Sequence, residues 1–249
     1  MHPGFARRGR AGDLKSASLR AGACFPGEVT HSLATMSGAS PRVIESSPLR
    51  YLLSLPASGH DGPLPLLCFL HGHDEAAPMA IDRALTLHGP LRAESLPRTQ
   101  DRFIIVAPQL RVAGDHWHRY AEAVRQIVLA VQATHGGDPR RTYLTGFSFG
   151  GNGVLDLARA QPELWAALWA VDPTRVPPPG LAQPLWLSIG EVARPRRAGF
   201  IHTLGLRDAD ATASGDRLYT DHGEDHVGSA TSAYQDERIY AWLLARRRE

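Results

Sequence analysis

One serine stands in a sequence setting that could make it a nucleophile. Ser148 lies between Gly146 and Gly150 in the pattern Gly-x-Ser-x-Gly. Residues 141–145 are a short β-branched and aromatic run typical of a buried strand, and residues 154–159 have a helical composition. A turn this tight leaves no room for side chains at the two glycines. We therefore expect a nucleophile elbow, which presents the Ser148 hydroxyl at the edge of a sheet.

The rest of the chain supplies the elements that such a turn needs around it. The residues before Pro162 predict a helix directly after the turn. Strands alternate with helices along the sequence, which implies an α/β fold with a mainly parallel sheet and helices on both faces. Strand patterns lie at 51–55, 66–70, 103–107, 166–171, 184–189 and 216–220, and helical patterns lie at 120–133 and 233–247, with a less regular one from 198 on.

The length of 249 residues suits one domain, which we expect over residues 41–249. Residues 1–40 have no sustained hydrophobic period and few large apolar side chains. They are predicted to be a disordered tail or an over-extended reading frame whose natural start is Met36. They lack the apolar segment of a secretory signal, and this favours a cytoplasmic protein.

Composition excludes several classes of function. The net charge of +2 is too small to indicate a nucleic-acid or membrane partner, and no apolar run is long enough to cross a bilayer. Two cysteines do not make a disulfide framework. Cys68 lies inside an apolar run, so we expect it to be a buried small hydrophobe.

Four stretches resemble the serine esterases of the α/β-hydrolase superfamily. The branch that they resemble most contains phospholipase/carboxylesterase, predicted-peptidase and feruloyl-esterase-like proteins. The resemblance spans about residues 48–249 and implies an α/β-hydrolase fold with a small-molecule ester substrate and no cofactor. The four stretches are Phe69-Leu70-His71-Gly72, residues 105–109 with Trp117 behind them, residues 141–153, and His226 with Tyr234 and residues 242–244.

The resemblance assigns a general base and an oxyanion hole. In this superfamily the nucleophile, the acid and the histidine follow one another in the chain, and the histidine lies between the last strand and the last helix. His222 and His226 both qualify. The run 223–226 matches the family's Gly-x-x-His turn, so His226 is the expected base and His222 a bystander. By the same resemblance, the backbone N–H groups of His73 and Phe149 would bind the oxyanion.

The acid of the triad departs from the family pattern. Members usually carry Asp about three residues after the glycine that ends the seventh strand. Here that glycine is Gly190, and Ala193 occupies the expected position. Glu191 is the nearest carboxylate and is our first choice, because Glu can replace Asp in this role. The other candidates, in order, are Asp172 at the end of the sixth strand, and then Asp208 or Asp210.

No metal is expected at the site. His71-x-His73-Asp74 resembles part of a metallohydrolase motif, but Glu75 stands where that motif requires a further histidine. His116 and His118 are expected to line the cleft or to face solvent.

The cleft should be open. The loop at 173–183 is too short to form a lid domain, which leaves room for short acyl esters or for the end of a larger substrate. Trp117 is the expected lining residue of this substrate pocket, whereas Phe147 and Trp169 are expected to pack in the core.

The sequence therefore predicts a serine hydrolase that cleaves carboxylic esters through an acyl-enzyme on Ser148, with His226 as general base. A peptidase or amidase of the same fold is one alternative. A non-catalytic binding protein with this fold is the other, and the departure at the acid position is its best support.

Overall fold

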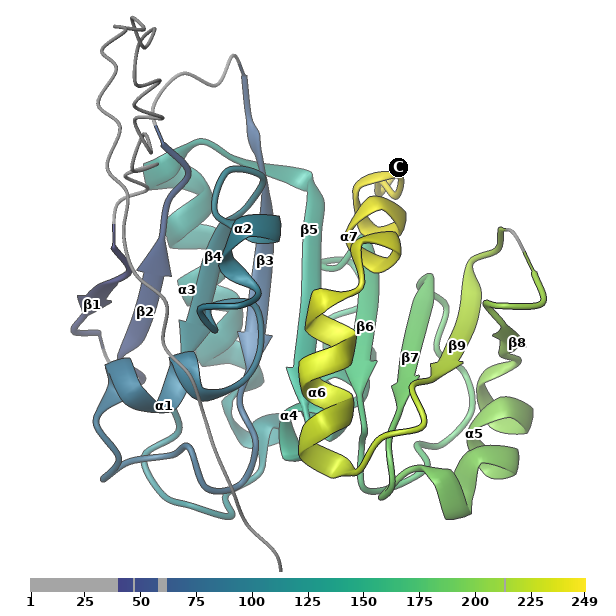
Figure 1. The fold of residues 1–249 in the computed structure, drawn as a ribbon. Coiled ribbons are helices and arrows are strands. Elements are labelled where there is room, and N and C mark those ends of the chain that lie inside the picture. Colours follow the sequence, from purple (N-terminus) through teal and green to yellow (C-terminus); the bar gives the residue numbers. More distant parts are fainter. Residues whose placement is uncertain (1–39, 47, 58–61, 213) are drawn as a thin grey trace, which may run out of the picture. The chain divides into compact units, whose positions relative to one another are not determined.

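Nine strands of the described chain form a single sheet in a computed structural model (Figure 1). The structure describes residues 40–46, 48–57, 62–212 and 214–249, all within one compact unit, Ser37–Glu249. A disordered tail or an over-extended reading frame was predicted for residues 1–40. Of these, residues 1–39 lie outside the described residues.

The sheet is mainly parallel, as predicted. Its order is β1-β2-β4-β3-β5-β6-β7-β9-β8; β1 and β2 pair antiparallel, as do β2 and β4, and the remaining neighbours pair parallel. The strands are β1 (Arg42–Ile44), β2 (Tyr51–Ser54), β3 (Leu64–Leu70), β4 (Ile104–Pro108), β5 (Gly137–Phe147), β6 (Ala167–Val171), β7 (Leu185–Ile189), β8 (Arg207–Asp208) and β9 (Arg217–Asp221).

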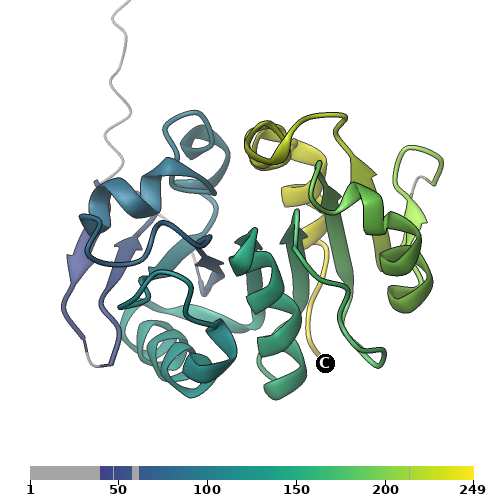
Figure 2. The ribbon, with the colours of Figure 1, turned by 90° about the horizontal axis from the view of Figure 1, so that it is seen from below.

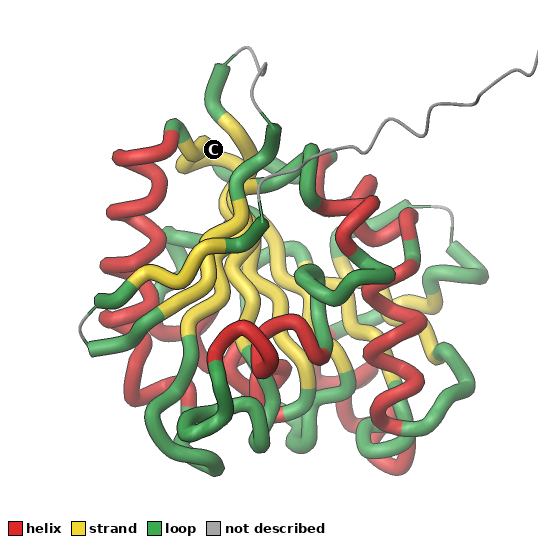
Figure 3. Tube along the Cα trace, turned by 60° about the vertical axis from the view of Figure 1, so that its left-hand side comes forward, coloured by secondary structure: helices red, strands yellow, loops and turns green. Residues whose placement is uncertain are grey.

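Helices cover both faces of this sheet (Figures 2 and 3). The α-helices are α1 (Ile81–Leu87), α2 (Leu96–Thr99), α3 (Ala121–His135), α4 (Phe149–Ala160), α5 (Arg197–Leu204), α6 (His226–Gln235) and α7 (Glu237–Leu244), and the short 3-10 helices are η1 (Trp117–Tyr120) and η2 (Arg194–Arg196). Within the described ranges, no helix has the length and apolar character needed to span a membrane.

The core consists of two layers, one on each side of the sheet. Alternate residues of β3 point to opposite faces: Leu66 and Cys68 pack with α3, α4 and α5, whereas Leu67 and Phe69 pack with α1, α6 and α7. Cys68 is fully buried, as expected of a small hydrophobe. Burial on both faces explains why the central strands read as continuous apolar runs.

Two details differ from the sequence prediction. The closing helix was predicted as one segment at 233–247, but the chain forms α6 and α7 with a break between them. Asp236 causes this break, because its extended backbone starts a new helix and its carboxylate accepts the Arg238 N–H at 3.0 Å. The short strands β1 and β8 were not predicted. The chain between β6 and β7 forms neither helix nor strand, which agrees with the expected absence of a large lid.

Candidate active site

Ser148 lies in a strained turn between β5 and α4. Its φ of 57° is in the left-handed region, which residues other than glycine rarely adopt. Its backbone N–H donates to the carbonyl of Val171, the last residue of β6, at 2.9 Å. The turn is thus fixed by the neighbouring strand, and Ser148 is held where β5 ends.

The two glycines of the Gly-x-Ser-x-Gly pattern are required by close backbone approach. A Cβ on Gly150 would overlap the carbonyl oxygen of Leu70 on β3, and a Cβ on Gly146 would overlap the carbonyl of Gly150. These neighbours are backbone atoms of β3 and α4, so moving them would cost stability. The tight turn inferred from the sequence is therefore present, with glycine at the positions that need it.

His226 contacts the hydroxyl of Ser148. The histidine is the first residue of α6, and its Nε2 lies 2.9 Å from Ser148 Oγ. The preceding residue, Asp225, caps the helix by accepting the Gly228 N–H at 2.7 Å. Its carboxylate is therefore occupied by the helix end, and another acid is needed to orient the imidazole.

That acid is Asp172, and the prediction of Glu191 at this position is wrong. Asp172 follows β6 directly and is fully buried, and its Oδ2 forms a short hydrogen bond with Nδ1 of His226. Glu191 is exposed instead. Asp172 was the second candidate from the sequence.

The loop after β7 contributes backbone donors rather than a carboxylate. Oδ1 of Asp172 accepts the N–H groups of Gly190 at 3.1 Å and Ala193 at 2.7 Å, and Oδ2 accepts that of Val192 at 3.3 Å. A Cβ on Gly190 would lie 2.6 Å from Oδ2, so only glycine leaves room for the carboxylate. These contacts satisfy a buried charge that would otherwise be costly.

The remaining candidate residues lie elsewhere. Asp208 accepts a hydrogen bond from the Tyr219 hydroxyl at 3.3 Å, and Asp210 pairs with Arg238 at 2.7 Å. His222 is half-buried, and burial lowers the pKa of its imidazole. The structure gives none of these three side chains a contact with Ser148 or His226 among the described residues.

His73 and Phe149, the expected oxyanion donors, lie side by side. Their rings are 5.0 Å apart and meet edge to face. Phe149 is the first residue of α4, and an N–H at this position has no partner within a helix. Within the described ranges, the N–H of His73 makes no backbone hydrogen bond either. Among the described residues, neither N–H group is thus given a backbone partner.

His71 holds the loop that carries His73. Its Nε2 accepts the Leu110 N–H at 3.0 Å, so the ring proton is on Nδ1, which donates to the carbonyl of Gly72 at 2.7 Å. Burial lowers the pKa of His71 to about 4, and the ring is neutral at physiological pH. His71 is therefore a structural residue of this loop.

Trp117 does not line a substrate pocket, and that prediction is wrong. Its side chain is 2% exposed, and its indole N–H donates to the carbonyl of His71 at 3.1 Å. The indole occupies the space that a Cβ on Gly153 of α4 would need. Trp117 thus supports the loop after β3 from the protein interior. Phe147 and Trp169 are buried, as expected.

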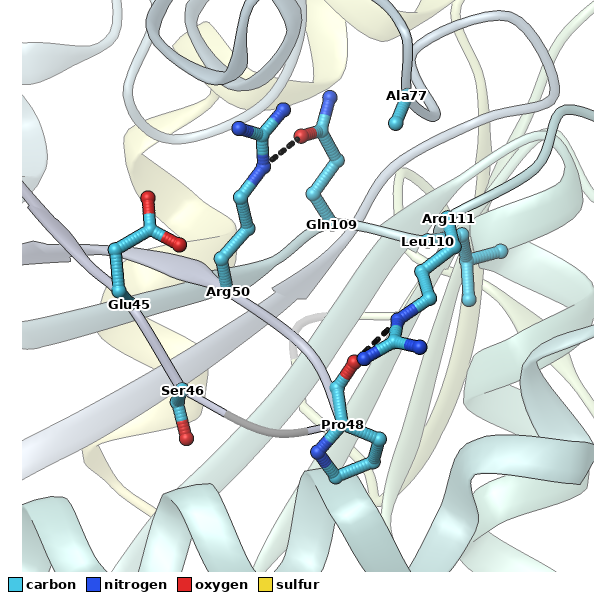
Figure 4. A pocket seen from close by; sticks show the side chains of 8 residues that line it. All are labelled: Glu45, Ser46, Pro48, Arg50, Ala77, Gln109, Leu110 and Arg111. Atoms are coloured by element: carbon cyan, nitrogen blue, oxygen red, sulfur yellow. Dashed lines mark hydrogen bonds between the residues drawn. The ribbon is translucent and has the colours of Figure 1, made fainter.

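Gln109, directly after β4, fixes the same loop through hydrogen bonds. Its amide nitrogen donates to the carbonyls of Glu75 at 2.9 Å and Met79 at 3.0 Å. Its amide oxygen accepts from Arg50 at 2.9 Å, the bond drawn in Figure 4. A hollow of about 180 Å³ lies against this support, and its lining includes neither Ser148 nor His226. The loop after β3 is thus fixed from the β4 side.

The histidines near the loop do not assemble a metal site. His73 pairs with Asp74 at 2.7 Å. His116 and His118 are exposed and stack on each other, and His116 also stacks on Phe149 with the ring centres 6.0 Å apart. In the part of the chain that the structure describes, no three His, Cys, Asp or Glu side chains are grouped to hold a metal ion.

The fold is that of solved serine hydrolases. No family model and no curated protein matches the sequence. Among solved structures, a thermostable esterase aligns with a TM-score of 0.60 at 20% identity, over 84% of this chain and 63% of its own. The chain thus spans less than two thirds of that esterase.

Two proteins of Staphylococcus aureus are similar over nearly their whole length. The fluorophosphonate-binding serine hydrolase FphF aligns with a TM-score of 0.59 at 12% identity, over 82% of this chain and 97% of its own. The S-formylglutathione hydrolase FrmB aligns with a TM-score of 0.58 at 12% identity, over 82% and 95%. The chain therefore has the α/β-hydrolase fold that the sequence resemblance implied.

Proposed function

We propose that the protein is a serine hydrolase that cleaves carboxylic esters. The observation that carries this proposal is the continuous set of hydrogen bonds from Ser148 through His226 to Asp172, with the serine on a strained, glycine-flanked turn. A fold shared with an esterase and two serine hydrolases supports it. The departure from the family pattern at the acid position was the best support for a non-catalytic protein, and the contact of Asp172 with His226 weighs against that alternative.

Acylation uses each residue in a role that its contacts allow. Ser148 Oγ attacks the ester carbonyl carbon while His226 Nε2 accepts the hydroxyl proton. The carboxylate of Asp172 fixes the proton on Nδ1 and stabilises the imidazolium that forms. The backbone N–H groups of His73 and Phe149 donate to the negative oxygen of the tetrahedral intermediate. This intermediate collapses as His226 gives its proton to the leaving alcohol.

Deacylation repeats these steps with water. His226 takes a proton from a water molecule, whose oxygen attacks the acyl carbon bound to Ser148. The second tetrahedral intermediate expels Ser148 Oγ, which recovers its proton from His226. The acid leaves, and the free enzyme is restored. Every bond and proton in this cycle is accounted for by the ester, one water molecule and the three side chains.

We infer a place for the leaving alcohol on the histidine side of the site, in a hollow whose lining adjoins His226 without including it or Ser148. A hollow of about 380 Å³ is lined by Val227, which follows His226, and by His88, whose ring packs on Phe147 beside His226. The exposed side chains of Leu87 and Val227 form part of this lining. Because His226 delivers the proton to the leaving group, we assign this hollow to the alcohol part of the substrate.

The proposal is tested by turnover of p-nitrophenyl acetate and butyrate. We expect Ser148→Ala to lower kcat by about 1,000-fold or more, because the nucleophile is lost. Ser46→Ala, at an exposed serine, should keep the wild-type rate. A wild type that hydrolyses neither ester would refute the proposal. Faster turnover of matched p-nitroanilides than of the esters would indicate an amidase instead.

A further inference from the structure

A second buried carboxyl lies beside the site, and the acylation chemistry does not use it. Glu75 follows β3, and its side chain is 7% exposed. Its Oε1 is 3.4 Å from Nε2 of His88, and its Oε2 has no hydrogen-bond partner among the described residues. Burying such an oxygen costs stability that an apolar residue would not cost. Buried, unpartnered titratable groups of this kind are concentrated at functional sites.

The free oxygen of Glu75 and the side chain of Ser148 both lie beside Gly72. A Cβ placed on Gly72 would be 2.9 Å from Glu75 Oε2 and 3.5 Å from Cβ of Ser148. The carboxyl and the serine therefore flank the same side of Gly72, the residue before the expected oxyanion donor His73. Glycine at this position is what allows the carboxyl to approach.

A second path links Glu75 to His226. The His88 ring packs against Phe147 with the ring centres 5.0 Å apart, and Phe147 packs against His226 at 4.6 Å. One buried aromatic ring thus separates the Glu75–His88 pair from the imidazole of His226. Because the His88 side chain is 13% exposed and Phe147 is 3% exposed, a charge on Glu75 acts on His226 with less screening than a surface charge does.

At physiological pH, Glu75 is the member of the Glu75–His88 pair that can carry a charge. Burial, together with the charges of Arg92 and His226, lowers the pKa of His88 to about 4, so His88 is neutral at physiological pH. Burial raises the pKa of Glu75, and Asp74 adds to this, whereas the nearby N–H dipoles of Glu75 and Gly72 and the charge of His226 oppose it. The titratable and charged groups that surround Glu75 and His226 are Asp74, His88, Arg92, Ser148, Asp172 and Asp225.

We propose that Glu75 is a positioning residue that acts through His226: its carboxylate stabilises the imidazolium of His226 during acylation. The catalytic part of this inference rests on the proposed ester hydrolysis, in which His226 is the base. Asp172 orients the His226 ring through Nδ1. Glu75 instead adds negative potential from its place beside Gly72. The sign follows: removing the carboxylate makes the imidazolium less stable and lowers the pH at which His226 loses its proton.

Glu75→Gln tests this, because it keeps the shape and hydrogen-bonding capacity of the side chain and removes the charge. We expect the acidic limb of the kcat/KM profile for p-nitrophenyl acetate to move to lower pH by about half a unit or more. We expect the plateau kcat to fall roughly 3- to 10-fold with KM unchanged. The control is Glu191→Gln, which removes an exposed carboxylate following β7 and should leave both quantities within about 2-fold of wild type.

A second readout needs no substrate. The imidazole of His226, assigned by comparison with a His226→Asn spectrum, is titrated by NMR in wild type and in Glu75→Gln. A lower titration midpoint in the variant supports the inference even if the wild type hydrolyses no ester, so the two proposals can fail separately. An unmoved midpoint overturns the inference. It is overturned equally if the rate falls only in proportion to a loss of folded protein, measured by thermal unfolding.

Discussion

At the scale of single residues, the site depends on how firmly each carboxylate is held. Asp172 is buried and accepts three backbone N–H groups together with the His226 ring, which fixes its orientation. Its hydrogen bond to Nδ1 leaves Nε2 free to accept the Ser148 proton. Glu191 lies nearby in the chain but faces solvent, where a flexible side chain orients nothing.

This difference gives a prediction for the acid. Asp172→Asn should lower kcat by about 1,000-fold or more, because an amide cannot hold the required tautomer or stabilise the imidazolium. Glu191→Gln should stay within about 2-fold of wild type. Both are measured as steady-state kcat on p-nitrophenyl acetate, with circular dichroism to show that each variant is folded. The assignment is contradicted if Glu191→Gln loses the activity and Asp172→Asn retains it.

A site residue can be predicted from the sequence when the residues that define its role lie close to it in the chain. The setting of Ser148 is contained in a few neighbouring residues, because the turn itself demands the two glycines. The role of Asp172 depends on contacts with Gly190, Ala193 and His226, which are far along the chain. Two of these contacts come from backbone N–H groups, which leave no mark on residue type. Glu75 was read only as the residue that disrupts a metal motif, and its relation to Ser148 appears only in three dimensions.

At the scale of elements, the β5 to α4 turn depends on its approach to β3. Gly150 packs against the carbonyl of Leu70, so α4 begins in contact with the backbone of the neighbouring central strand. This contact holds Ser148 beside the loop that carries His73. A side chain at Gly150 would separate the two halves of the site before it changed any chemistry.

Gly150→Ala should therefore lower the free energy of unfolding by about 3 kcal/mol and abolish most ester hydrolysis. The matched change is Gly199→Ala in α5, where the new Cβ would meet only a side-chain methyl of Val176 at 3.3 Å. That variant should be as stable as wild type or up to about 1 kcal/mol more stable, since alanine favours a helix. Urea unfolding measures both. Equal stability of the two variants would contradict the packing described at Gly150.

The elements differ in how much sequence signal they carry. Seven strands have apolar or β-branched runs long enough to be predicted. The edge strands β1 and β8 have three and two residues, so their pairing with a neighbour, rather than a pattern, defines them. The start of α6 at His226 depends on the cap provided by Asp225. A hydrophobic period alone places the helix later, where its apolar residues begin.

At the scale of the whole domain, the strand order brings the site together. In a parallel sheet the carboxyl ends of the strands share one edge, where ligands bind. Here the loop after β3, the turn after β5, the end of β6 and the start of α6 all lie at that edge (Figure 1). Asp172 directly follows β6, and His226 is the first residue of α6. The fold is shared with solved hydrolases at 12–20% identity, so the argument for catalysis rests on this chain's own contacts.

The central claim is that Ser148 is a nucleophile activated by His226 and Asp172, and covalent labelling tests it most directly. The protein is incubated with a fluorophosphonate and its intact mass and peptides are measured. We expect a single adduct on the peptide that contains Ser148, absent in Ser148→Ala and formed far more slowly in His226→Asn. An unlabelled wild type, or an adduct that persists in Ser148→Ala, would contradict it.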